Sequence, residues 1–71
     1  MPRPPTDDDI AALSKYIECG TIRSAALALG VQPATLDARL VRIHEKVGVS
    51  TTPQAIYLLA ARIEEHRRER P

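Results

Sequence analysis

A short glycine-to-proline turn between two helix-favouring stretches constrains this chain more than any other feature. Residues 23–29 are rich in alanine and leucine and predict a helix that ends at Gly30, because glycine readily takes the positive φ of a helix exit. Pro33 lacks an N–H and has a preset φ, so it suits the first position of a second helix, although Gln32 before it is a poor N-cap. Two helices joined by so short a turn predict a helix-turn-helix, the unit that places its second helix in the major groove of DNA.

Apolar residues recur on one face of the second predicted helix, residues 33–47. Their spacing of three or four residues places them on one side of an α-helix: Leu36, Leu40, Ile43 and Val47. The preceding helix offers a facing surface with small side chains that allow a close approach: Ala25, Ala26 and Leu29. The opposite side of the second helix is mixed and predicted to be exposed: Ala34, Thr35, Asp37, Ala38, Val41 and Arg42, with Arg39 at its margin.

A further helix is expected before this pair. Thr6 is its predicted N-cap, with Asp9 as the capping-box partner, and Gly20 ends it; Thr21 then caps the next helix. Its buried stripe is expected to be Ile10, Leu13, Tyr16 and Ile17. The acids at positions 7, 8 and 9 are consecutive, so a helix directs them about 100° apart and they cannot converge on a metal ion.

A fourth helix is expected after Gly48, with Thr52 as its N-cap and Pro53 in its first position. Residues 55–63 are apolar almost all the way round, and one neighbouring helix cannot cover both sides of such a helix. The second side therefore predicts a homodimer. The core side is expected to hold Ile56, Leu59 or Ala60, and Ile63, and the dimer interface is expected to hold Ala55, Leu58, Leu59 and Arg62.

The chain has 71 residues, which predicts one small domain over residues 6–66, between a flexible arm (1–5) and a charged tail (67–71). The formal net charge of +1 is weak for a nucleic-acid-binding protein. The charge is nevertheless positive around the helix pair, where cations outnumber acids: Arg23, Arg39, Arg42 and Lys46 against Asp37 and Glu45. Arg3 in the arm is expected to be solvated, with a DNA contact as the alternative.

Several functional classes find no support in the sequence. Cys19 is the only cysteine, which excludes an internal disulfide, and the start of the chain lacks the apolar segment of a signal peptide. No apolar run is long enough to span a bilayer, so we expect a cytoplasmic protein, and Met1 favours a complete product. Cys19 and the two histidines lack a nucleophile–base spacing, and His44 is expected to face solvent, so no enzyme, metal, cofactor or small-molecule ligand is predicted.

Motifs along most of the chain resemble the LuxR/GerE-type DNA-binding domain. The resemblance covers about residues 6–63 and is carried by Gly20-Thr21, Ala25-Ala26, Leu29-Gly30-Val31, Thr35-Leu36, Ile43, Lys46-Val47-Gly48-Val49 and Gln54-Ala55-Ile56. Residues 20–43 are also similar to the helix-turn-helix of LysR-type and PucR-type regulators. The fourth helix favours the LuxR/GerE type, because those regulators lack it.

The resemblance implies an all-α, four-helix helix-turn-helix domain that binds double-stranded DNA as a homodimer, with its third helix in the major groove and its fourth pairing the subunits. Carried over by position, it implies base-facing and backbone-facing residues. The base-facing set is Asp37, Ala38, Val41 and Arg39, and the backbone-facing set is Arg23, Ser24, Thr35, Arg42 and Lys46. Asp37 departs from the family's frequent lysine, Gln32 from its capping serine and Arg39 from its common histidine.

Three roles are open for Asp37: it accepts a hydrogen bond from cytosine N4, it repels DNA, or it pairs with Arg39 or Arg42. Two functional hypotheses follow for the whole chain. The first is a sequence-specific transcription regulator of a bacterial-type cytosol. The alternative is a protein-interaction module on the same scaffold, binding a regulator or a polymerase subunit, which the near-neutral charge favours.

Overall fold

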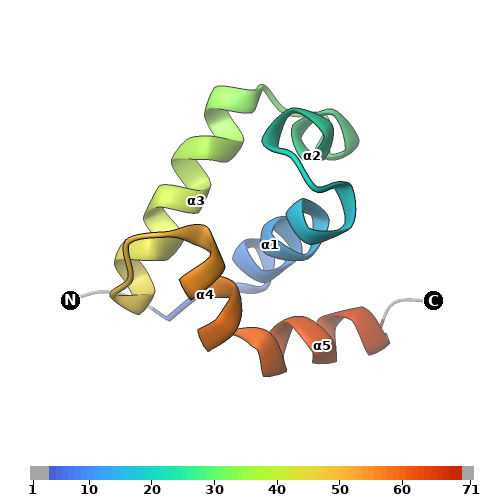
Figure 1. Cartoon of the computed structure of the whole chain (residues 1–71). Coiled ribbons are helices and arrows are strands. Elements are labelled where there is room, and N and C mark those ends of the chain that lie inside the picture. The colour runs from blue at the N-terminus through green and yellow to red at the C-terminus, as the bar shows by residue number, and fades with distance from the viewer. Residues whose placement is uncertain (1–3, 70–71) are drawn as a thin grey trace.

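The computed structural model describes residues 4–69, and this part of the chain folds into five α-helices without a strand (Figure 1). The helices are α1 (Asp7–Cys19), α2 (Ile22–Leu29), α3 (Pro33–Val47), α4 (Thr52–Leu58) and α5 (Ala60–Glu69). The all-α prediction is confirmed. The structure has one helix more than the four expected, because the predicted fourth helix is divided at Leu59.

The predicted ends of the first three helices are confirmed, because local capping chemistry defines them. Asp9 N–H donates to Thr6 Oγ1 at 3.2 Å, and Thr6 N–H donates to Asp9 Oδ2 at 3.0 Å, which completes the capping box of α1. Thr21 caps α2 with a single bond, which its Oγ1 accepts from Ser24 N–H at 3.1 Å. Gly48 ends α3 with a φ of 74°, a value that glycine adopts without a Cβ clash.

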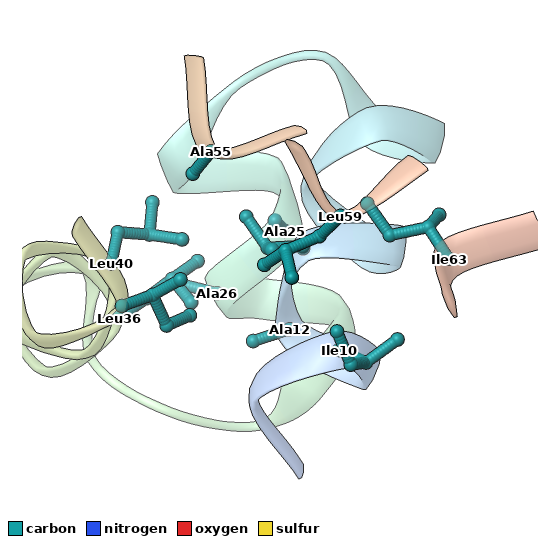
Figure 2. Close-up of a cluster of buried hydrophobic side chains, with 11 residues drawn as sticks. Ile10, Ala12, Ala25, Ala26, Leu36, Leu40, Ala55, Leu59 and Ile63 are labelled. Carbon is teal, nitrogen blue, oxygen red and sulfur yellow. The ribbon is translucent and has the colours of Figure 1, made fainter. Parts of the chain in front are cut away.

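Helix α1 lies in the middle of the fold and packs against α2, α3 and α5, while α3 also contacts α2 and α4 (Figure 1). The buried apolar side chains come from all five helices and meet in one core: Ile10, Ala12, Leu13, Ala25, Ala26, Leu36, Leu40, Ile43, Ala55, Leu59 and Ile63 (Figure 2). Tyr16, Ile17 and Val47 are only partly buried at its edge. Three of the four residues of the predicted α3 ridge, Leu36, Leu40 and Ile43, are therefore inside the fold, and Val47 lies at its edge.

The start of α4 differs by one residue from the prediction. Thr51, not Thr52, is the N-cap: Gln54 N–H donates to Thr51 Oγ1 at 3.4 Å, and Thr51 N–H donates to Gln54 Oε1 at 3.1 Å. Pro53 therefore occupies the second helical position. The capping box decides the boundary, because Gln54 stands three residues after Thr51 and can return a hydrogen bond to it.

The helix bends at Leu59, where φ is −101° and ψ is 12°. Hydrogen bonds nevertheless continue across the bend, from Leu59 N–H to Ala55 O and from Ile63 N–H to Leu59 O, each at 2.9 Å. Helix α5 then runs through Glu69, past residue 66, where the folded domain was expected to end. The predictions for residues 1–3, including Arg3, and for residues 70–71 lie outside the described residues.

Candidate nucleic-acid interface

The turn between α2 and α3 is built as its sequence predicts. Gly30 has a φ of 73°, and its N–H donates to the carbonyls of Ala26 and Leu27 at the end of α2. Val31 N–H also donates to the Ala26 carbonyl, at 3.0 Å, so the chain turns away with its carbonyls satisfied. Gln32 makes no side-chain cap, and Pro33 opens α3. This arrangement fixes the direction in which α3 leaves α2.

Small side chains bring α2 and α3 together. Ala25 and Ala26 are fully buried in the same core as Leu36 and Leu40 of α3, and Ala26 lies toward those two leucines (Figure 2). Leu29 was predicted to belong to this contact, but it is 37% exposed. It is the last residue before the turn, where the chain leaves the packed face, so α3 covers it only in part.

The opposite side of α3, which we call the outer face, is exposed along its length. It comprises Ala34, Thr35, Asp37, Ala38, Val41, Arg42 and Glu45. The predicted base-facing residues Asp37, Ala38 and Val41 therefore all reach the surface, as do Thr35 and Arg42. Glu45 was not among the predicted site residues, although its position two turns after Asp37 on a 3.6-residue helix places it on this face.

Lys46 does not belong to the exposed cations that were predicted to contact DNA. Its Nζ donates to Asp9 Oδ2 of α1 at 2.6 Å, and its side chain is 23% exposed. Arg39 Nη1 lies 3.5 Å from Asp9 Oδ1, with 45% of its side chain exposed. We call Asp9, Lys46 and Arg39 the Asp9 cluster. The structure thus pairs Lys46 with a carboxylate of the same chain, and the predicted contact of Lys46 with the DNA backbone stays a prediction.

The electrostatics of the cluster follow from its burial and its hydrogen bonds. The Asp9 side chain is only 5% exposed. Burial raises the pKa of this carboxyl, but hydrogen bonds from Lys46 and Thr6 and the positive charge of Lys46 outweigh it and hold the pKa below its ordinary value of 3.8. Asp9 is therefore ionised at neutral pH and joins the start of α1 to the last turn of α3.

The beginning of α2 provides two further predicted contacts, Arg23 and Ser24. Both are exposed, so the guanidinium of Arg23 and the hydroxyl of Ser24 lie within reach of a ligand. The N–H of Ser24 is already bonded to Thr21 Oγ1, so it is not open to a phosphate. Arg23 and Arg42 are thus exposed cations on the two helices that the Gly30 turn joins, α2 and α3.

The predicted dimer interface is partly wrong. Ala55 is fully buried and Leu59 is 8% exposed, because both lie, four residues apart, on the side of the helix that packs into the monomer's core. Arg62 Nη1 donates to the Pro5 carbonyl at 2.8 Å and Nη2 lies 3.7 Å from Asp7 Oδ1, so Arg62 secures the start of the described chain. Leu58, which is 56% exposed, faces outward as expected, and the Arg62 side chain stays 41% exposed while it makes these contacts.

Tyr57, which the prediction missed, lies beside Leu58 and is 82% exposed. The two residues border a shallow depression of about 420 Å³ lined by Val49, Pro53, Gln54, Tyr57 and Leu58, which we call the Tyr57 patch. The all-round apolar sequence of residues 55–63 contained the signal for an outward apolar side. The sequence did not show how the helix is rotated about its axis, and this rotation is what brings Tyr57 to the surface.

Two other sequence expectations concern ligands. His44 was expected to face solvent, but it is half-buried and its Nε2 is hydrogen-bonded to Thr52 Oγ1 at 2.8 Å, which connects α3 to α4. Among the described residues, no three His, Cys, Asp or Glu side chains lie close enough together to hold a metal ion. None of the helices between residues 4 and 69 combines the length and apolar character that crossing a membrane requires.

Comparison of the chain with protein-family models, with curated proteins and with solved structures found no significant match to any of them.

Proposed function

We propose that the chain is a sequence-specific DNA-binding transcription regulator that acts as a homodimer, with α3 lying in the major groove. The observation that carries the proposal is the division of α3 into two sides: Leu36, Leu40 and Ile43 are at most 2% exposed, while the outer face is exposed along its length. A helix about 10–12 Å across fits a groove about 12 Å wide. Small Ala34 and Ala38 on the outer face favour a close approach to base edges.

Phosphate contacts would come from few side chains. Arg23 and Arg42 are exposed on α2 and α3, whereas Lys46 is occupied by Asp9 and Arg39 is partly matched by it. Each phosphate that a cation neutralises steepens the dependence of binding on salt by about 0.9 logarithmic units. The Asp9 cluster therefore predicts a shallow salt dependence for each protomer, of about two such units.

A second protomer would compensate for these few contacts. The Tyr57 patch exposes a tyrosine and a leucine of α4 next to Val49 and Pro53, and exposed apolar patches of this kind mark protein interfaces. A symmetric dimer would place two copies of α3 over two half-sites and double the number of phosphate contacts. The sequence predicted an interface of Ala55, Leu58, Leu59 and Arg62; the Tyr57 patch keeps Leu58 from this set and takes the place of the other three.

Fluorescence polarisation with a labelled random-sequence duplex, at about 50 mM salt, tests DNA binding directly. We expect the wild-type chain to bind and the double variant Arg23→Ala/Arg42→Ala to lose most of that binding. The matched control is Arg67→Ala/Arg68→Ala, which removes two exposed arginines from α5, away from the helix-turn-helix. Equal losses in the two double variants would show that binding is diffuse and would contradict the proposed interface.

The dimer is tested separately by sedimentation of the wild-type chain and of Tyr57→Glu, which places a charge in the Tyr57 patch. We expect a concentration-dependent dimer for the wild type and a monomer for the variant. Because Tyr57 is 82% exposed in the monomer, the substitution leaves the core intact. A wild-type chain that stays monomeric when bound to DNA would remove the homodimer from the proposal.

One observation favours a protein-interaction module as the second candidate. Around α2 and α3 the charges nearly cancel, and Leu27 on α2 is 83% exposed: four cations (Arg23, Arg39, Arg42 and Lys46) face three acids (Asp9, Asp37 and Glu45), which leaves +1. A surface with balanced charge and an exposed leucine suits a protein partner better than a polyanion. Failure of the folded wild-type chain to bind any duplex at low salt would favour this candidate over DNA binding.

A further inference from the structure

Three neighbouring side chains on the outer face of α3 combine one strong hydrogen-bond acceptor with two purely apolar groups. Asp37, Ala38 and Val41 are all exposed, and Val41 retains 45% of its surface. At 3.6 residues per turn they project within an arc of about 100°, with Val41 between the other two. Asp37 and Ala38 lie in the second turn of α3, near the end from which helix-turn-helix proteins reach base edges, and Val41 lies one turn further along, at the middle of the helix.

The chemistry of the three side chains selects among the base edges in the major groove. An ionised carboxylate only accepts hydrogen bonds, so it is repelled by the acceptors of guanine (N7 and O6) and of thymine (O4). Cytosine presents its N4 amino group as a donor, whereas adenine places the N7 acceptor beside its N6 donor. Ala38 and Val41 offer neither donor nor acceptor and suit a methyl group on C5 of a pyrimidine.

We propose that the outer face of α3 recognises the amino group of a cytosine together with a pyrimidine C5 methyl group beside it. Asp37 accepts a hydrogen bond from cytosine N4, and Val41 and Ala38 contact the methyl group. This inference rests on the proposed DNA-binding function. Two sources can provide the methyl: methylation of the same cytosine, whose C5 adjoins C4, or a neighbouring thymine. In both cases the recognised surface is an amino donor flanked by a methyl group.

Selection from a random duplex library tests the cytosine. The wild-type chain is expected to enrich cytosine at one position of each half-site, with a discrimination of about 5- to 150-fold over the other bases. Asp37→Asn is expected to move that preference to adenine, because a carboxamide bonds adenine N6 and N7 together. Glu45→Gln is the matched control: it also removes one acid from the exposed outer face, but nearer the end of α3.

The outcomes separate the inference from the function on which it rests. A wild-type chain that binds no duplex overturns both. Binding without cytosine enrichment, or an unchanged preference in Asp37→Asn, overturns the inference and leaves DNA binding intact. If Glu45→Gln changed the selected base as much as Asp37→Asn, the reading would not belong to Asp37. Both acids are exposed, so neither variant disturbs the core.

Two modified versions of the selected duplex identify the source of the methyl. In one, the selected cytosine carries a C5 methyl group; in the other, each neighbouring thymine is replaced by uracil, which lacks only that group. We expect one of these changes to alter the affinity of the wild-type chain by about fourfold, the effect of burying one methyl, and Val41→Ser to lose the difference. If neither change alters the affinity, the contact with Val41 and Ala38 is overturned.

Discussion

Lys46 and Arg42 are cations of the same helix, one turn apart, and their surroundings differ. Lys46 is bonded at 2.6 Å to Asp9, whose side chain is 5% exposed, whereas Arg42 is exposed on the outer face. The same holds for the apolar residues: Ile43 is fully buried and Val41 is 45% exposed. The inner side of α3 therefore supports the fold, and its outer face is exposed. Substitutions on the inner side should lower the free energy of unfolding, whereas substitutions on the outer face should leave it nearly unchanged.

The largest effect is expected from the apolar pair. Ile43→Ala removes a fully buried side chain and leaves a cavity between α3 and its neighbours, which should lower the free energy of unfolding by about 2–5 kcal/mol. Val41→Ala changes only the exposed outer face and should alter it by less than about 0.5 kcal/mol. Urea denaturation followed by circular dichroism measures both. A comparable loss in Val41→Ala would show that the outer face is covered in solution.

The charged pair gives the next largest effect. Lys46→Met leaves Asp9 buried without its shortest hydrogen bond and should cost about 1–3 kcal/mol of unfolding free energy. Arg42→Met removes an exposed charge and should cost less than about 0.5 kcal/mol. The same denaturation experiment compares them. Equal losses would mean that the Asp9 cluster contributes no more than a surface ion pair.

Local signals in the sequence predicted most of the fold. Thr6, Thr21 and Gly30 define helix ends through contacts within a few residues, so their roles can be read from the chain alone. The ridge of α3 and its exposed outer face likewise follow from the helical period. The candidate site was predictable to the same extent, since Asp37 and Val41 were assigned to the exposed side by spacing.

Contacts between distant residues were not predictable in this way. Asp9 was predicted only as a capping residue, and its pairing with Lys46 bridges a sequence separation of 37 residues. That contact depends on how α1 packs on α3, which no local pattern encodes. Ala55 and Leu59 share the buried side of their helix with Ile63, but the helix is apolar almost all the way round, so a small change in its rotation would exchange inner and outer residues. Long-range packing thus decides which predicted site residues remain available.

Lowering the pH should remove the contribution that Asp9, paired with Lys46 on the inner side of α3, makes to the stability of the fold. The pKa of Asp9 in the folded chain lies below the ordinary 3.8, which we take for the unfolded chain, so its contribution is complete above that value. It is lost as the pH falls through the lower folded-state pKa. Asp9→Asn should therefore be less stable than the wild type at neutral pH and approach it in acid. Asp37→Asn is the control, and urea midpoints measured from about pH 6 to about pH 2 compare the three proteins.

The smallest effect is expected in the salt dependence of DNA binding. If Arg42 contacts phosphate, Arg42→Ala should make the plot of log affinity against log salt shallower by about 0.9 for each bound protomer. Arg39→Ala should change the slope less, because Asp9 Oδ1 lies 3.5 Å from the Arg39 guanidinium and partly matches its charge. Polarisation titrations at several salt concentrations measure both. Equal changes would show that Arg39 leaves Asp9 when DNA binds, and the division between the two sides of α3 would then hold for Lys46 but not for Arg39.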